Sequence, residues 1–201
     1  HTSIVRCVDI SPLQSNNKND NNNKMNNIGV VGGNGYTICS GSWDKIRIWD
    51  IETTKQLNVF KGHESWINSV KYGSNELLNT ILSGSADKSI RLWDIRSGEQ
   101  IQVFNRHTHH VYAVEYLPFV IKNIIGNSNV ICSGSLDNTI RFWDIRSNKN
   151  ELHIIKGDEK EDCRITCLKF VSLKKKDKTK NVKYNLNLCY GSYKGPIRIW
   201  E

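Results

Sequence analysis

Three common sequence features are missing from this chain of 201 residues. It has no run of eighteen apolar residues, which excludes a predicted transmembrane helix, and its first residues do not show the pattern of a secretory signal. No stretch of eleven residues shows the apolar period of an amphipathic helix. These absences predict an intracellular protein, cytoplasmic or nuclear, that has no membrane span.

The chain does contain an internal repeat. The stretch SGSADKSIRLWDIR at residues 83–96 returns as SGSLDNTIRFWDIR at residues 133–146. An earlier copy occupies Ser40–Asp50 and a divergent copy occupies Tyr190–Glu201, so that four tryptophans end the copies at intervals of 44, 50 and 57 residues. A repeat of about 20 to 50 residues is typical of stacked units, because each unit covers the exposed face of its neighbour.

A second phrase precedes each copy. KGHESWINSVKY at residues 61–72 corresponds to NRHTHHVYAVEY at 105–116, to the start of the chain, and to a longer version at 156–170. The Gly-His pair (Gly62, His63), the Ser-Gly-Ser-x-Asp stretch and the Trp-Asp pairs together resemble the WD40 repeat family. This resemblance implies a β-propeller in which each repeat corresponds to one blade.

Each unit also has the composition of a small sheet. In the second unit, runs rich in Val, Ile, Tyr, Phe and Trp lie at Trp66–Tyr72, Thr80–Ser85, Ser89–Asp94 and Gln100–Phe104, separated by turn residues. Such a sheet has two apolar faces and is not stable alone, whereas radial stacking buries both faces. The predicted fold class is therefore all-β, a WD40 β-propeller with four blades present. We assign one propeller region to residues 1–201, with repeats at 1–50, 51–94, 95–144 and 145–201, an Asn-rich insertion at 14–35 and a Lys-rich insertion at 173–185.

The number of repeats leads to an expectation about the whole ring. The family resemblance implies about seven blades, and this chain has four copies of the first three strands but three of the fourth. Repeat arrays need protected ends. We therefore expect the four blades to be an arc of a larger ring.

The six cysteines do not predict a disulfide framework. When the units are aligned, Cys39, Cys132 and Cys189 take the strand position of Leu82. Cys7 and Cys167 take a position that holds small residues in the other units. We expect these five to be buried small hydrophobic side chains in a reducing compartment. Cys163, in a loop, is the one expected to be reactive.

The two insertions fall between first and second strands, so both are expected on the same face of the ring. Eight of the fourteen residues at 14–27 are asparagine, and neither insertion is expected to order itself. The run Lys174–Lys180 has five positive charges and one negative, half of the net charge of +8. It could attract nucleic acid. A solubilising loop is favoured, because no aromatic side chains interleave with these lysines.

A repeated set of polar residues has the same residue types as a catalytic triad. His63, Ser83 and Asp87 have the composition of a hydrolase triad, but no GxSxG elbow is present and the set occurs more than once. The family resemblance implies structural hydrogen-bonded tetrads in which Trp donates to Ser, Ser to His, and His to Asp. We predict no enzymatic activity and no cofactor. The expected tetrads are His1, Ser40, Asp44 and Trp49; His63, Ser83, Asp87 and Trp93; and His107, Ser133, Asp137 and Trp143.

A metal site is not predicted either. In the HTHH stretch at residues 107–110, His107 is assigned to a tetrad, which leaves His109 and His110 without carboxylate or thiol partners nearby. Neighbouring residues on a strand point to opposite faces, which is unsuited to chelation.

The two WDIR stretches support a more specific hypothesis. Residues 81–96 and 131–146 resemble the box through which some WD40 proteins dock on the adaptor of cullin-type ubiquitin ligases, with Cys132 as one departure. In that case Arg96 or Arg146 would make the charged contact. The alternative is that each arginine is an exposed residue at the end of a strand.

The partner site is expected on the face opposite the insertions. We call it the turn face, because it carries the turns between second and third strands. Exposed Trp, Tyr and Arg often dominate binding energy. The residues predicted there are Trp43, Trp66, Tyr112, Leu136, Tyr193, Arg6 and Arg164. The predicted function is a non-enzymatic protein-interaction scaffold. The alternatives are a substrate receptor of a ubiquitin ligase and a propeller that associates with nucleic acid, and we rate nucleic acid as the less favoured partner.

Overall fold

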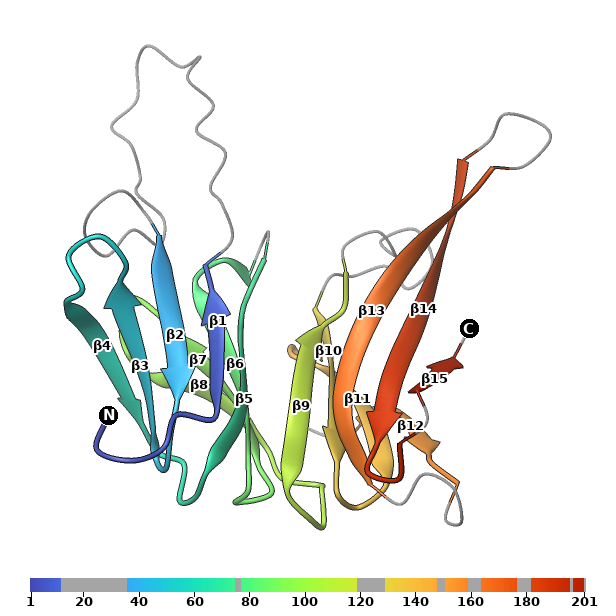
Figure 1. The fold of residues 1–201 in the computed structure, drawn as a ribbon, viewed down its shortest axis with the longest axis horizontal. Helices are drawn as coiled ribbons and strands as arrows, with labels where there is room; N and C mark the ends of the chain where they lie inside the picture. The colour runs from blue at the N-terminus through green and yellow to red at the C-terminus, as the bar shows by residue number, and fades with distance from the viewer. Residues whose placement is uncertain are drawn as a thin grey trace.

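A computed structural model describes residues 1–11, 36–74, 77–118, 129–147, 151–158, 164–176, 182–195 and 197–200. These residues form four antiparallel sheets that stand one after another in chain order (Figure 1). No α-helix occurs in the described ranges, and none of their segments is a helix able to cross a membrane. The predicted all-β class is confirmed.

Within each sheet the strands lie in chain order. The first sheet contains β1 (Cys7–Ile10), β2 (Thr37–Gly41), β3 (Lys45–Asp50) and β4 (Gln56–Lys61). The second contains β5 (Ile67–Tyr72), β6 (Thr80–Ser85), β7 (Ile90–Asp94) and β8 (Gln100–Phe104). The third contains β9 (Val111–Tyr116), β10 (Val130–Ser135), β11 (Thr139–Asp144) and β12 (Glu151–Lys156). The fourth contains β13 (Ile165–Lys176), β14 (Val182–Ser192) and β15 (Ile197–Trp200).

The sheets are offset from the sequence repeats by one strand. Strand β4 lies inside the range 51–94 assigned to the second repeat, yet it pairs with β3 of the first sheet. A blade therefore takes its outer strand from the beginning of the next repeat. The expected ring of about seven blades stays a prediction.

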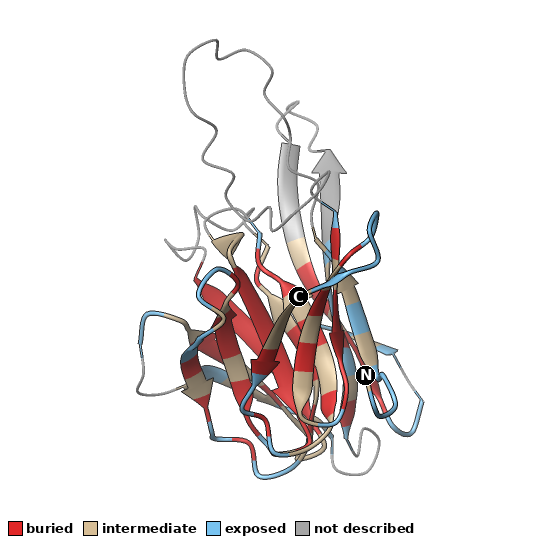
Figure 2. Ribbon diagram, turned by 90° about the vertical axis from the view of Figure 1, so that its left-hand side faces the viewer, coloured by how far each residue is buried: buried red, intermediate tan, exposed pale blue. Residues whose placement is uncertain are grey.

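Burial follows the stacking of the sheets. The first strands of successive sheets lie next to one another, and the sheets pack face to face. Strands β6 and β10 are buried along their whole length, because each is a second strand covered on both faces. Strand β3 instead alternates between buried and half-buried residues. Buried residues are concentrated in the strands and exposed residues in the connecting loops (Figure 2).

A glycine in each second strand allows the next sheet to approach closely. A Cβ atom added to Gly41 would lie 2.7 Å from Cγ2 of Ile67, and one added to Gly84 would lie 2.7 Å from Cγ1 of Val111. At Gly134 the corresponding distance to Cγ2 of Ile165 is 2.6 Å. These distances are shorter than carbon atoms tolerate. The first apolar residue of each following strand therefore packs directly on the glycine backbone.

Aromatic pairs complete the core between sheets. Phe60, at the end of β4, packs on Trp93 with ring centroids 5.8 Å apart, and Phe104 packs on Trp143 at 5.3 Å. All four side chains are buried. In the fourth sheet Trp200 is 46% exposed. The repeated Trp at the end of the third strand is thus a core residue in the second and third sheets.

Two expectations about the insertions and cysteines need correction. The flanks of the Lys-rich insertion form a paired ladder that continues to Lys176 opposite Val182, because β13 and β14 extend as one long hairpin. Of the five cysteines predicted to be buried, Cys39 and Cys132 are buried, Cys7 and Cys189 are half-buried, and Cys167 is exposed. The Asn-rich insertion and Cys163 lie outside the described residues.

Candidate functional site: the turn face

The turn face lies at the lower side of Figure 1, where β2 turns into β3 and each later second strand turns into its third. The β13–β14 hairpin extends on the opposite side. Two kinds of predicted residue lie on the turn face. The tetrads hold the turns in place, and aromatic and basic side chains form the surface.

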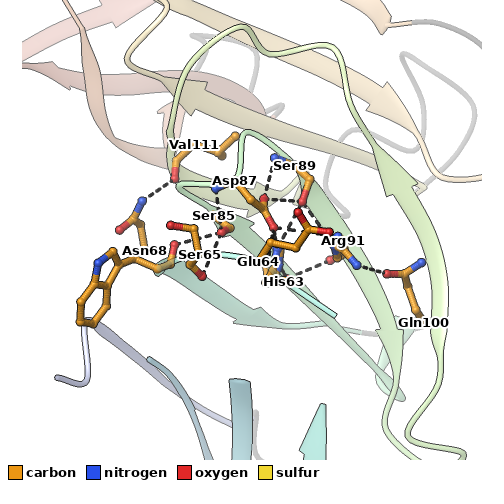
Figure 3. A network of polar contacts seen from close by, with 12 residues as sticks. His63, Glu64, Ser65, Asn68, Ser85, Asp87, Ser89, Arg91, Gln100 and Val111 are labelled. Atoms are coloured by element: carbon orange, nitrogen blue, oxygen red, sulfur yellow. Dashed lines mark hydrogen bonds and ion pairs between the residues drawn. The ribbon is translucent and has the colours of Figure 1, made fainter. Parts of the chain in front are cut away.

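The tetrad of the second sheet is a continuous hydrogen-bond chain, and Figure 3 shows the part of it around His63 and Asp87. Nε1 of Trp93 donates to Oγ of Ser83 at 2.8 Å, and this Oγ lies 2.7 Å from Nε2 of His63. Nδ1 of His63 lies 2.8 Å from Oδ2 of Asp87. Oδ2 also accepts the backbone N–H of Glu64 at 3.0 Å. The chain therefore ties the β6–β7 turn to the loop before β5.

The protonation of this chain follows from burial and charge. Burial lowers the pKa of His63 below its usual value, although Asp87 opposes that shift. Burial alone would raise the pKa of Asp87, but hydrogen bonds from His63, from the hydroxyl of Ser89 and from the N–H of Glu64 outweigh it and hold that pKa well below its usual range. A neutral His63 beside an ionised Asp87 donates from Nδ1, so its Nε2 accepts the hydroxyl proton of Ser83.

The third sheet repeats the same geometry. Nε2 of His107 lies 2.8 Å from Oγ of Ser133, which accepts Nε1 of Trp143 at 2.9 Å, and Nδ1 lies 2.7 Å from Oδ2 of Asp137. Like Ser83, Ser133 has no exposed surface. A hydroxyl that is fully buried and already hydrogen-bonded on both sides cannot attack a substrate. Both sets act as structural ties.

Sequence reasoning missed two hydroxyls that complete each tie. Oγ of Ser89 donates to Oδ1 of Asp87 at 2.6 Å, so both carboxylate oxygens are fixed. Oγ of Ser85 accepts the N–H of Asp87 at 3.1 Å and donates to the carbonyl of Trp66 at 3.0 Å. The sequence repeat could have revealed both hydroxyls, because Thr139 takes the place of Ser89 in the third sheet and Ser135 takes the place of Ser85. Through Ser85 the tie positions the residue before β5.

The first sheet departs from the expected tetrad. Nε2 of His1 lies 2.7 Å from Oγ of Ser40, and Trp49 donates to the same oxygen at 2.8 Å. Within the described residues Asp44 has no bond to His1, and its carboxylate instead lies 3.5 Å from Nζ of Lys45. The assignment of Asp44 to a tetrad was therefore wrong.

The cause is a turn that is one residue shorter. Gly41 pairs with Ile46, whereas Gly84 pairs with Ile90 after one more residue. The β6–β7 turn includes Lys88 at a φ of 72°, and the β2–β3 turn has no residue at positive φ. Without that residue the carboxylate does not reach the histidine.

An aromatic and basic cluster lies where the first three sheets meet. The rings of Trp43, in the β2–β3 turn, and Trp66, before β5, pack edge to face with centroids 5.0 Å apart. Cζ of Arg6 lies 4.3 Å from the Trp66 ring centroid, and its Nη1 donates to Oδ1 of Asn68 at 3.0 Å. Asn68 in turn donates to the carbonyl of Val111 at 3.0 Å (Figure 3). Trp43 remains 45% exposed.

The other predicted surface residues lie in separate groups. Cζ of Arg164 lies 5.2 Å from the ring centroid of Tyr193, which is 70% exposed. Tyr112 is half-buried and stacks on His110, with centroids 6.5 Å apart. Leu136 is half-buried in the β10–β11 turn. The structure thus joins Arg6, Trp43 and Trp66 in one cluster and shows no contact between this cluster and the Arg164–Tyr193 pair.

The WDIR stretches lie at the opposite ends of the third strands. Oδ1 of Asp94 accepts the backbone N–H groups of Arg96 at 2.7 Å and of Ser97 at 2.8 Å, and Ile95 is buried. Asp144 accepts the N–H of Arg146 at 2.9 Å in the same way. The Asp of each WDIR stretch therefore stabilises the turn through backbone hydrogen bonds, and Ile95 packs in the core. Both arginine side chains are exposed.

The histidines of the HTHH stretch lie near each other without further metal ligands. The rings of His109 and His110 have centroids 4.7 Å apart, and Nδ1 of His109 accepts the N–H of His110 at 2.9 Å. No group of three or more His, Cys, Asp or Glu side chains with metal-binding geometry occurs in the part of the chain that is described.

Comparison with known proteins agrees with this architecture. The family model "WD domain, G-beta repeat" matches residues 54–94 and 98–144. The computationally designed Ika4 protein, known from a crystal structure, has a similar fold with a TM-score of 0.59. It is 22% identical, and the match covers 82% of this chain and 84% of that one. At this identity the likeness concerns the fold alone. The chain therefore contains WD40 repeats at residues 54–94 and 98–144, and its four sheets are arranged like the blades of a β-propeller.

Proposed function

We propose that this protein is a non-enzymatic interaction scaffold whose main partner site is the turn face, centred on Trp43 and Trp66. WD40 repeats typically bind protein partners and generally have no catalytic activity. The observation that carries the proposal is the contact between these two tryptophans from adjoining blades, of which Trp43 stays 45% exposed.

A neighbouring blade carries a small residue at the equivalent turn position. Ala86 occupies the position of Trp43 in the second sheet, where the turn is held by its tetrad. The indole of Trp43 therefore exposes apolar surface that a partner could bury. Large aromatic side chains contribute strongly to binding when a partner removes them from water.

The cluster is also held in place before any partner binds. Asn68 fixes Arg6 through a hydrogen bond, and the guanidinium group lies over the Trp66 ring. The carbonyl of Trp66 accepts a hydrogen bond from the turn serine Ser85. A surface that is fixed in advance loses less conformational entropy on binding, which favours affinity.

The test begins with the selection of short peptides from a random displayed library on the wild-type protein. The affinity of each selected peptide is then measured for the wild type and for the double variant Trp43→Ala, Trp66→Ala. We expect a loss of at least about 2 kcal/mol, or roughly thirtyfold. The matched control is Arg96→Ala with Arg146→Ala, on the opposite side. Thermal melts check that each variant is folded.

Two outcomes would contradict the proposed site. The selected peptides could bind the double tryptophan variant as tightly as the wild type. Binding could also survive in that variant but disappear when residues 174–180 are deleted, which would place the partner on the opposite side. The exposed variant Trp43→Ala alone distinguishes lost binding from any disturbance caused by removing the half-buried Trp66.

A second candidate function is substrate reception for a ubiquitin ligase. It is favoured by the equivalent, exposed positions of Arg96 and Arg146 at the ends of neighbouring blades. A purified cullin adaptor should then bind the wild-type protein and not the variant Arg96→Ala, Arg146→Ala. Adaptor binding that is unchanged in this variant would exclude docking through the WDIR stretches.

Binding of nucleic acid has weaker support. The Lys-rich segment is flanked by a paired β13–β14 ladder, and its composition lacks the aromatic side chains on which bases stack. Binding of RNA that depends strongly on salt and disappears on deletion of residues 174–180 would support this candidate instead.

A further inference from the structure

Four basic residues from three blades lie on the turn face, on the segments that surround Trp66. We infer that this group binds the carboxylate of an acidic side chain from the partner, so that the bound segment carries Asp or Glu next to an apolar residue. The inference rests on the proposed function and adds the chemistry of the partner to it. The four side chains are those of Arg6, Lys88, His109 and His110.

Several contacts place these side chains together. Cζ of Arg6 lies 4.3 Å from the Trp66 ring centroid, and the rings of His109 and His110 have centroids 4.7 Å apart. Arg6 precedes β1, Lys88 lies in the β6–β7 turn, and both histidines precede β9. Asn68, which accepts a hydrogen bond from Arg6, donates to the carbonyl of Val111, the residue after His110. The N–H of Ala86, two residues before Lys88, donates to the carbonyl of Trp66 at 2.8 Å.

No described carboxylate neutralises this group. Arg6 is held by an amide oxygen and an aromatic ring. Among the described residues, the ion pairs of Asp44 and Asp87 are made with Lys45, His63 and Arg91, and none is made with Lys88. Glu64 lines a cavity of about 350 Å³ together with Lys88, yet the two form no ion pair. Uncompensated positive charge at an exposed aromatic cluster favours a negative partner group.

The aromatic rings favour an acidic peptide over single-stranded nucleic acid. One face of the Trp66 ring is covered by Arg6, and Trp43 packs against it edge to face. Tyr112 stacks on His110. Bases need open ring faces on which to stack. One face of Trp66 is thus covered and Trp43 is the exposed ring of the cluster, while the guanidinium, ammonium and imidazole groups around them offer N–H donors, which suit carboxylate oxygens.

The group also predicts the pH dependence of binding. Burial and the charges of His109, Lys88 and Arg6 lower the pKa of His110 below its usual value. A bound carboxylate favours the protonated imidazole, so binding takes up a proton. Affinity should therefore rise as the pH falls from about 7.5 to about 6, where Asp and Glu of the peptide stay ionised.

The experiment uses the peptides selected on the wild-type protein. We expect them to be enriched in Asp and Glu relative to the unselected library. Lys88→Asn should weaken their binding by about threefold to fivefold, the range of one exposed ion pair. Asparagine is suitable there because Asn138 takes the same turn position, with a φ of 61° where Lys88 has 72°. Lys55→Gln, which removes an exposed charge near the β3–β4 turn, is the matched control and should change nothing.

Each remaining outcome is decisive. Peptides that depend on Trp43 and Trp66 but show no enrichment in acidic residues would overturn this inference and leave the proposed function intact. Acidic peptides that bind Lys88→Asn as tightly as the wild type, or that bind more weakly as the pH falls, would overturn it as well. An oligothymidylate that competes with the peptides and loses affinity in Lys88→Asn would assign the basic group to nucleic acid. If no selected peptide loses affinity when Trp43 and Trp66 are replaced, both the proposed function and this inference are wrong.

Discussion

Replacing Gly84 with alanine tests how closely the blades must pack. The new Cβ atom would lie 2.7 Å from Cγ1 of Val111 and 2.9 Å from Cγ1 of Val114. Both valines are almost completely buried, and they belong to a core that also contains Leu82 and Trp143. Neither side chain can therefore rotate away, and β5–β8 and β9–β12 must separate or distort.

The expected cost follows from two opposing effects. Overpacking of a well-packed core typically costs about 1–3 kcal/mol. Gly84 has no positive φ, so alanine also restricts the unfolded chain, which stabilises by roughly 0.4–1 kcal/mol. The steric effect is larger. We expect Gly84→Ala to lower the free energy of unfolding by about 1–2 kcal/mol.

Urea unfolding followed by tryptophan fluorescence measures this change. The matched control is Gly191→Ala, the equivalent glycine of the fourth sheet, whose added Cβ would meet, among the described residues, only the thiol of the exposed Cys167. This control should cost less than about 0.5 kcal/mol. Val111→Ala provides the rescue, because it removes the closest methyl groups, and Gly84→Ala should cost less in that background.

Two results would refute this reasoning. Gly84→Ala and Gly191→Ala could cost the same, which would mean that packing between blades does not decide the effect. The cost of Gly84→Ala could also remain unchanged when Val111 is alanine, in which case the clash is not with the following blade.

Other predictions concern the tetrads. Trp93→Phe should destabilise the protein by at least about 1 kcal/mol more than Trp200→Phe in thermal or urea unfolding, because Trp93 is buried and donates to a buried serine while Trp200 is 46% exposed; equal costs would contradict the structural role. Asp87→Asn should be clearly destabilising and Asp44→Asn nearly neutral, since Asp87 binds His63 and Asp44 does not bind its histidine. The folded-state pKa values of His63 and Asp87 are both lowered, so the unfolded chain binds more protons and stability should fall on acidification, first below about 6.5 and further below about 4. Unfolding midpoints across this pH range check the sign, and Asp87→Asn should reduce the loss at low pH, to which Asp137 also contributes.

The sequence by itself determined the repeating unit and most of its internal bonds. The strands, the turns and the tetrads of the second and third units depend on residues at fixed spacing within one repeat, so each copy of the phrase implies the same local geometry. The sequence also contained the reason why Asp44 does not join a tetrad, because SGSWDKIRIWD is one residue shorter than SGSADKSIRLWD. A shorter turn changes which side chains can reach each other, and the identity of the aspartate alone does not reveal that.

Only the tertiary structure decided what lies between repeats. The contact of Trp43 with Trp66, the position of Arg6 over that ring, and the link from Asn68 to Val111 all join different sheets. Residues this far apart in sequence meet at distances set by how closely the blades pack, which no spacing within a repeat encodes. The exposure of Cys167 has the same origin, because burial of a strand residue depends on whether a neighbouring sheet covers it. The local pattern therefore determined the blades, and the packing of blades produced the candidate binding surface.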